Sequence, residues 1–291
     1  MKKTLLLLLI SFFMSSLAYA EPPKKFKSKK YKQYQTKVYK KKLKVSKKFY
    51  SPNSSYAIYD YSSSQFDNEH NVTDIKSIAS ITKLFTAITV VNSKADLNEK
   101  LYVTGNNGGK VIKGSWISRI DLLKAMVTNS DNLAAEVLAN NHPRGFKQFI
   151  IDANDYNKRI GLKHTEIVDS SGLLPGNVST AADLVLFLNS IKDNDVIKEI
   201  ANLRGHEIAV PRPKGKRIIT IKFHNTNPDI YKMDNVIISK TGFTNPAGRC
   251  VVMLVERGQK LYALVVLGAR TPSDRSRILH NLLDKANTVH I

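Results

Sequence analysis

The chain reads Ser80-Ile81-Thr82-Lys83-Leu84-Phe85-Thr86-Ala87-Ile88 where a short β-rich start gives way to a helical pattern. The apolar residues of this stretch recur at helical spacing, which predicts a largely buried helix over residues 81–91. Ser80 and Lys83 would lie one turn apart on the same face. Burial lowers the pKa of a lysine, so the neutral amine could take the proton of the serine. Alternatively, Ser80 caps the helix and Lys83 reaches water.

A second polar cluster, Ser130-Asp131-Asn132, separates two predicted helices in the middle of the chain. All three residue types are favoured at helix starts, so the cluster could simply cap the helix that begins at Leu133. A catalytic use is compatible with capping. Ser130 would relay a proton, and Asn132 would offer its amide to a substrate peptide group.

A third cluster, Lys240-Thr241-Gly242, follows a predicted strand over residues 235–239. It could be no more than a polar strand end. A cation, a hydroxyl and a bare glycine on a strand edge also suit a substrate carboxylate whose backbone lies alongside as an extra strand. The three clusters, in this order, indicate a serine acyl-transfer site in which a lysine activates the hydroxyl.

The first twenty residues have the pattern of a secretory signal. A basic start is followed by an apolar run over residues 5–17 and by Ala18-Tyr19-Ala20 before Glu21. The run is shorter than the roughly 20 residues that a spanning helix needs, which disfavours the alternative of a retained membrane anchor. We expect cleavage near Ala20 and export to the periplasm, with peripheral association with the membrane or cell wall as a further option.

Residues 21–50 carry thirteen lysines against one acidic residue, within a chain of formal net charge +21. Such a segment cannot bury enough apolar area to fold alone, which predicts a disordered tether. It could be a plain spacer. Residues 24–48 could instead adhere to an anionic membrane or cell-wall surface. Nucleic acid would satisfy the charge too, but we expect no such partner for an exported protein.

Residues 51–291 are long enough for one large catalytic domain with its own core. Cys250 is the single cysteine, so no intramolecular disulfide can form, and its apolar neighbours predict a buried small residue. The seven histidines show no zinc-ligand spacing. We therefore expect neither a metal nor a cofactor.

The periodicity predicts a hairpin, then helices, then strands, and a closing helix. The hairpin covers residues 56–73 with Asn68-Glu69-His70-Asn71 near or beyond its turn. The predicted elements beyond residue 100 are helices over residues 120–128, 133–139, 145–160 and 181–191, strands over residues 217–223, 235–239, 248–256 and 261–269, and a helix from Pro272 to about 285.

Over about residues 51–285 the chain resembles the low-molecular-weight penicillin-binding proteins, D-alanyl-D-alanine peptidases that share their fold with the serine β-lactamases. Besides the three clusters, the resemblance rests on Ser171-Gly172-Leu173, Asn177-Val178-Ser179-Thr180-Ala181 and Lys240-Thr241-Gly242-Phe243-Thr244. It implies a three-layer α/β fold: a mainly antiparallel five-stranded sheet flanked by helices. A mostly helical lobe would be inserted between the Ser-x-x-Lys helix and the C-terminal strands.

The same resemblance implies roles for the cluster residues. Ser80 would attack the penultimate D-alanine carbonyl of a muropeptide with Lys83 as base, and Ser130 would protonate the leaving amine. The residues implied to bind the substrate are Asn132, Lys240, Thr241, Gly242 and Phe243. Of these, Phe243 would contribute its backbone N–H, with that of Ser80, to the oxyanion hole.

Only 49 residues follow Gly242, which resembles the endopeptidase branch of the family more than carboxypeptidases with an added β-rich domain. We therefore expect a peptidoglycan cross-link endopeptidase, inhibited covalently by β-lactam antibiotics, with carboxypeptidase as the alternative. A class A β-lactamase would need a Glu-x-x-Leu-Asn stretch, and the sequence after Glu166 departs from it. A non-catalytic β-lactam sensor or wall-binding module is the remaining alternative.

Overall fold

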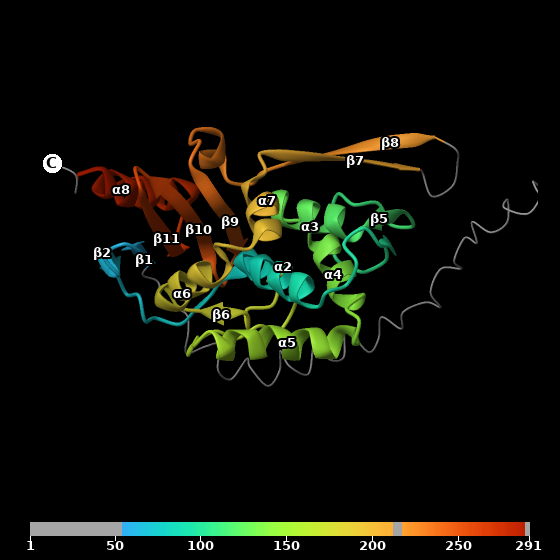
Figure 1. Cartoon of the computed structure of the whole chain (residues 1–291), viewed down its shortest axis with the longest axis horizontal. Coiled ribbons are helices and arrows are strands. Elements are labelled where there is room, and N and C mark those ends of the chain that lie inside the picture. Colours follow the sequence, from blue (N-terminus) through green and yellow to red (C-terminus); the bar gives the residue numbers. More distant parts are fainter. Residues whose placement is uncertain (1–53, 212–216, 289–291) are drawn as a thin grey trace, which may run out of the picture.

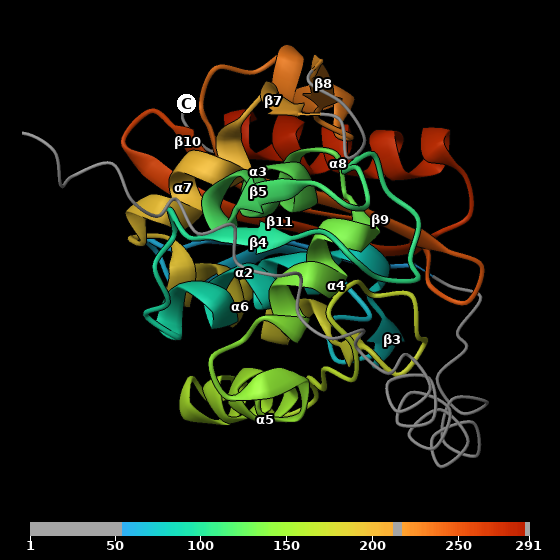
Figure 2. The ribbon, with the colours of Figure 1, turned by 90° about the vertical axis from the view of Figure 1, so that its right-hand side faces the viewer.

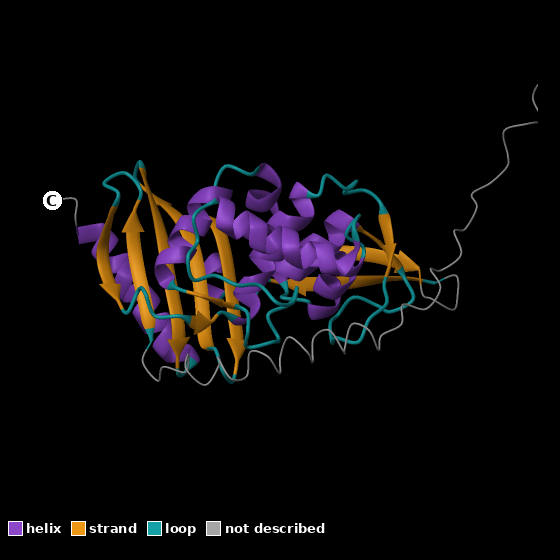
Figure 3. Ribbon diagram, turned by 90° about the horizontal axis from the view of Figure 1, so that it is seen from below, coloured by secondary structure: helices purple, strands orange, loops and turns teal. Residues whose placement is uncertain are grey.

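The computed structural model describes residues 54–211 and 217–288. The predicted signal and the lysine-rich tether lie outside these residues. Within them, no helix combines the length and the apolar character that crossing a membrane requires. Figures 1 and 3 show a β-sheet at one end of the molecule and a helical lobe at the other.

One antiparallel sheet of five strands organises the described chain. Its strand order is β2-β1-β11-β10-β9, so the chain's first hairpin pairs with its last strands. The strands are β1 (Ser55–Asp60), β2 (Gln65–His70), β9 (Val236–Thr244), β10 (Gly248–Arg257) and β11 (Lys260–Ala269). β9 is an edge strand, which leaves its outer side unpaired within the sheet.

Helices cover both faces of this sheet, which confirms the predicted three-layer α/β fold. On β10, Val252 and Leu254 belong to the apolar cluster shared with the helical lobe. Val251 and Met253 belong to a second cluster, with Leu279 of α8 (Pro272–Thr288). This alternation is the period of two that a strand buried on both faces must have.

The helical lobe lies between β2 and β9 in the chain and consists of the Ser-x-x-Lys helix α2 together with the helices predicted to follow it (Figure 1). Its helices are α2 (Thr82–Asn92), α3 (Arg119–Thr128), α4 (Asn132–Asn140), α5 (Gly145–Arg159), α6 (Ala181–Ile191) and α7 (Asp195–Asn202). Thr180 caps α6 by accepting a hydrogen bond from the Asp183 amide, at the place where its sequence favours a cap. Cys250 is fully buried, as expected.

Minor strands complete the lobe. They are β3 (Lys76–Ser77) with β6 (Val178–Ser179), β4 (Lys100–Tyr102) with β5 (Trp116–Ser118), and β7 (Gly205–Pro211) with β8 (Ile218–His224). The β7–β8 hairpin and α5 lie on opposite sides of the lobe (Figures 1 and 2).

The Asn68-Glu69-His70-Asn71 stretch lies beyond the first turn, which is one of the two positions predicted for it. Residues 68–70 continue β2, and the chain turns at residues 61–64 instead. The Asp60 carboxylate accepts hydrogen bonds from the backbone N–H groups of Ser62 and Ser63, which fixes the turn. The turn is therefore made by residues 61–64 and fixed by the Asp60 carboxylate, and the Asn-Glu-His-Asn stretch takes no part in it.

Two expectations were incomplete or wrong. The pattern before Pro213 did not reveal α7 or β7. The cluster Lys240-Thr241-Gly242 does not close its strand, because β9 continues to Thr244. The cluster thus occupies the middle of an edge strand, where its backbone can pair with an added strand.

Candidate active site

Ser80 and Lys83 lie at the start of the buried helix α2. Ser80 is in the short 3-10 helix η1 (Ala79–Ile81), and α2 follows it without a break. Lys83 Nζ donates a hydrogen bond to Ser80 Oγ at 2.8 Å. Ser80 is not a helix cap, since Ile81 occupies that position and no side chain caps α2.

Lys83 is fully buried, so the alternative of a lysine that reaches water is wrong. Its Nζ also contacts Asn132 Oδ1 at 2.7 Å and the Ser171 carbonyl at 2.6 Å. Loss of hydration lowers the pKa of Lys83 to about 7, against the opposing charges of Asp169 and Asp131. A substantial fraction of this amine is therefore neutral near pH 7, as a base for the serine hydroxyl must be.

The cluster Ser130-Asp131-Asn132 contains both a helix cap and a side chain that contacts Lys83. Asp131 is the N-cap of α4 and accepts a hydrogen bond from Ala134 N at 2.8 Å. Ser130 has a left-handed backbone with φ 58°, a conformation that costs about 1–3 kcal/mol and is often found at functional sites. The Asn132 side-chain oxygen faces Lys83, so the contact with Lys83 uses Oδ1 and not Nδ2.

Lys240 and Thr241 are both buried, although they belong to the edge strand β9. Lys240 is buried, and its Nζ donates to the Thr241 carbonyl at 2.9 Å. Loss of hydration, followed by the nearby Lys83, holds the pKa of Lys240 well below its usual value. The Thr241 hydroxyl lies 2.6 Å from the hydroxyl of Thr226.

Two glycines allow separate chain segments to approach the Ser80 backbone. A Cβ on Gly242 would lie 2.9 Å from Ser80 N, and a Cβ on Gly172 would lie 1.9 Å from the Ala79 carbonyl oxygen. Any other residue would displace the serine at either position. Phe243, the next residue on β9, is 47% exposed, and the Arg249 guanidinium lies 3.6 Å from its ring centroid.

The sequence did not reveal how residues 169–177 form the loop whose Ser171 carbonyl accepts a hydrogen bond from Lys83. The buried Asp169 carboxylate accepts hydrogen bonds from the amides of Ser171 and Gly172, and Asn177 binds the same carboxylate. These bonds orient the Ser171 carbonyl toward Lys83. The stretches containing Ser171 and Asn177 supported the family resemblance, but the bonding between them was not foreseen.

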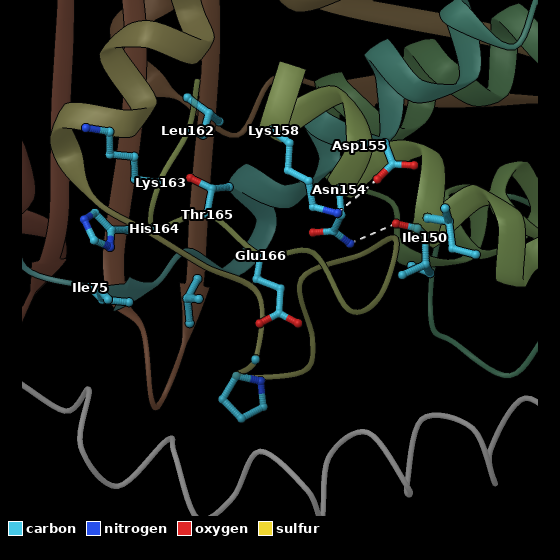
Figure 4. A pocket seen from close by; sticks show the side chains of 14 residues that line it. Ile75, Ile150, Asn154, Asp155, Lys158, Leu162, Lys163, His164, Thr165 and Glu166 are labelled. Atoms are coloured by element: carbon cyan, nitrogen blue, oxygen red, sulfur yellow. Dashed lines mark hydrogen bonds and ion pairs between the residues drawn. The ribbon is translucent and has the colours of Figure 1, made fainter. Parts of the chain in front are cut away.

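A cavity of about 650 Å³ in the described part of the chain is lined by none of the residues of the three clusters. It lies between α5 and residues 162–178, and Glu166 is among the side chains that line it (Figure 4). Glu166 also bridges to Val178 through its backbone. Glu166 therefore belongs to the α5 side of the fold, separate from the residues that contact Ser80.

Metal chemistry has no candidate centre in the described part. Among residues 54–211 and 217–288, no three His, Cys, Asp or Glu side chains are grouped closely enough to hold an ion.

The fold and the Ser80 and Lys83 geometry define the class of low-molecular-weight penicillin-binding proteins. The chain belongs to the D-alanyl-D-alanine carboxypeptidase family, peptidase family S11, whose model matches residues 41–271.

Two curated relatives are D-alanyl-D-alanine endopeptidases. The one from Escherichia coli K12 is 38% identical over 203 residues, which are 67% of this chain and 64% of the relative. The one from Pseudomonas aeruginosa is 38% identical over 200 residues, which are 66% of this chain and 63% of the relative. The match thus spans slightly less than two thirds of the length of either relative.

Solved structures show the same fold. Penicillin-binding protein D2 from Listeria monocytogenes, in its ampicillin-bound form, is 28% identical with a TM-score of 0.70, covering 82% of this chain and 99% of that one. The Streptomyces K15 DD-transpeptidase is 21% identical with a TM-score of 0.73, covering 82% of this chain and 97% of that one.

Proposed function

We propose that this protein is a serine D,D-peptidase that cuts peptidoglycan cross-links through an acyl-enzyme on Ser80. The observation that carries the proposal is the buried Lys83 amine, 2.8 Å from Ser80 Oγ and with a pKa of about 7. A serine hydroxyl is a weak nucleophile until a neighbouring base takes its proton. Lys83 supplies that base without a histidine.

The reaction would proceed in two steps. Ser80 Oγ attacks the penultimate D-alanine carbonyl while Lys83 takes its proton, and the backbone N–H groups of Ser80 and Phe243 stabilise the oxyanion. The close approach of Gly242 to Ser80 N supports this placement of the two donors. Ser130 then passes a proton to the leaving amine, and water releases the acyl-enzyme.

The substrate is proposed to lie antiparallel to β9 as an added strand. Asn132 Nδ2 would hold the acyl side, and Thr241 with Lys240 would hold the carboxylate side. Lys240 is buried, so it would not contact the substrate directly. When protonated, its charge would attract the carboxylate that Thr241 binds.

Endopeptidase is preferred to carboxypeptidase because the relatives at 38% identity are endopeptidases. The Escherichia coli carboxypeptidase DacC is 31% identical. Carboxypeptidase remains the second candidate, since both reactions break the same type of peptide bond.

Cross-linked and monomeric muropeptides separate the two activities. We expect purified protein to convert cross-linked dimers to monomers over many turnovers and to leave the terminal D-alanine of monomeric pentapeptides largely in place. Mass spectrometry of the products is the measurement. Removal of terminal D-alanine from monomers with dimers left intact would favour the carboxypeptidase.

Benzylpenicillin tests the same site against the β-lactamase alternative. An opened β-lactam stays attached to its acyl group and obstructs water, and Glu166 lines a cavity that none of the cluster residues lines. We expect a burst of one equivalent on Ser80 and slow release. Continuous rapid hydrolysis without an adduct in the mass spectrum would support a β-lactamase instead.

We also propose that the protein is exported to the periplasm and that the lysines of residues 24–48 bring it to anionic surfaces. Salt screens such attraction over about 8 Å at physiological ionic strength. Deleting residues 21–48 should reduce binding to anionic vesicles or sacculi at low salt and leave activity on small muropeptides unchanged. Equal binding of both forms would indicate a plain spacer.

A further inference from the structure

A loop segment beside the Ser130-Asp131-Asn132 cluster is fastened to α4 by two buried carboxylates. This segment, residues 105–111, is called the clamped segment below. Asp131 Oδ2 accepts hydrogen bonds from Lys110 N at 2.5 Å and Val111 N at 3.1 Å. Glu136 Oε2 accepts from Asn106 N at 2.9 Å and Asn107 N at 2.8 Å. Four backbone N–H groups of one short segment thus converge on two carboxylates of one helix.

Both carboxylates are almost completely buried. Among residues 54–211 and 217–288, neither forms an ion pair with a lysine, arginine or histidine. Burying a carboxylate without compensation is expensive, so its hydrogen bonds have to replace the lost water. Backbone N–H groups supply that replacement here, and hydrogen bonds to an ionised acceptor are about twice as strong as neutral ones.

The packing leaves the clamped segment little freedom. A Cβ on Gly109 would lie 2.1 Å from Asp131 Oδ1, and one on Gly105 would lie 2.7 Å from Glu136 Oε2. The Gly108 carbonyl accepts a hydrogen bond from Leu133 N, the residue after Asn132. Gly105 and Gly109 therefore allow the segment to approach Glu136 and Asp131 this closely.

The clamped segment is connected to the candidate active site through Asp131. Asp131 lies between Ser130 and Asn132, and its other oxygen caps α4 through Ala134 N. Asn132 Oδ1 in turn accepts a hydrogen bond from Lys83. A displacement of the first turn of α4 would move Ser130 and Asn132 together relative to Ser80.

We propose that Asp131 and Glu136 are positioning residues, which lock residues 105–111 onto α4 and thereby hold Ser130 and Asn132 in register with Ser80 and Lys83. The proposal rests on the function proposed above. Asp131 has a second effect, because its charge opposes the lowering of the Lys83 pKa, whereas Glu136 is not among the groups that shift it. Both carboxylates therefore hold the clamped segment, but only Asp131 also affects the pKa of Lys83.

The test compares Glu136→Gln and Asp131→Asn with Asp195→Asn, which changes an exposed aspartate at the start of α7. Three quantities are measured on each folded protein: the second-order rate of acylation by a fluorescent penicillin, the hydrogen exchange of the residue 105–111 amides, and the thermal midpoint. Misplacing catalytic groups by about 1 Å can lower a rate by up to about 10²-fold. We expect Glu136→Gln to speed exchange at Asn106 and Asn107 and to slow acylation at least about tenfold.

The pH profile of acylation separates the two carboxylates. Asp131→Asn removes a charge that raises the Lys83 pKa, so its acid limb should move to lower pH. Glu136→Gln should lower the rate at all pH values without moving that limb, a result that mere loss of stability would not give. Asp195→Asn should match the wild type in every measurement.

Two results would overturn the proposal. Acylation of Glu136→Gln at the wild-type rate, with its loop amides exchanging faster, would show that the clamp does not position the site. Unchanged exchange at Asn106 and Asn107 would show that Glu136 does not hold the segment. If the wild-type protein is not acylated on Ser80, the proposed function fails instead, while the exchange data still report on the clamp.

Discussion

Replacing Ser80 by alanine is expected to abolish covalent labelling by a fluorescent penicillin and to leave the fold intact. The change removes one hydroxyl from a half-buried position, whose hydrogen bond comes from Lys83 Nζ. Lys83 keeps its bonds to Asn132 and Ser171, so its amine is not left unsatisfied in the core. The measurement is gel fluorescence of the labelled protein together with the thermal midpoint.

The control is Ser63→Ala, which removes a hydroxyl from the exposed turn between β1 and β2. This variant should be labelled as the wild type is. Labelling of Ser80→Ala at the wild-type rate would show that another residue is the nucleophile. A large drop in the thermal midpoint of Ser80→Ala would mean that loss of labelling reports on folding, and mass spectrometry of a wild-type adduct would then have to locate the acyl group.

Much of the architecture could be predicted from periodicity because it rests on local patterns. The apolar residues of 181–191 recur at helical spacing after the cap residue Thr180, and the observed helix α6 has the same bounds. The strands β10 and β11 are apolar runs separated by Gly258-Gln259, and they pair antiparallel.

The ambiguous turn and the missed strand lie where tertiary contacts override local signals. Residues 68–70 have turn-forming types, but they pair with Tyr56, Ala57 and Ile58 of β1, and a carboxylate from Asp60 builds the turn earlier. β7 exposes most of its residues and lacks a continuous apolar run, so its pairing with β8 decides its conformation.

The site was predictable as three clusters but not as a bonded network. The contact between Lys83 and Ser171 joins residues 88 positions apart, and no spacing rule reaches that far. Lys240 and Asp169 are both buried, and their burial depends in the same way on how distant segments pack. Sequence types therefore indicated the chemistry, and the fold determined which groups are buried and which pKa values shift.

Removing the Lys83 amine should have the next largest effect. Lys83→Ala and Lys83→Met should still bind β-lactam, but each should acylate at least about 10²-fold more slowly, since general-base catalysis typically contributes that much. Lys83→Met preserves more of the buried volume and so separates loss of the base from loss of packing. Lys76→Met is the matched control, because Lys76 is a buried lysine of β3 whose pKa is also lowered by burial.

The pH dependence of stability provides an independent check on the same residue. Burial lowers the folded-state pKa of Lys83 from 10.5 to about 7, so between these values the unfolded chain binds more protons than the folded one. The free energy of unfolding should therefore rise with pH from about 7 toward 10.5. This rise should be smaller in Lys83→Met, and denaturant unfolding of both proteins across that pH range measures the difference.

The acid limb of the acylation rate decides whether Lys83 is the base. Below its pKa of about 7 the ammonium form predominates and cannot accept the proton of Ser80, so the wild-type rate should fall about tenfold per pH unit there. In Lys83→Met the residual rate should lose this dependence, because the group that titrates is gone. An acid limb that stays near pH 7 in Lys83→Met would assign the titration to another group and would remove the main support for lysine-activated acyl transfer at Ser80.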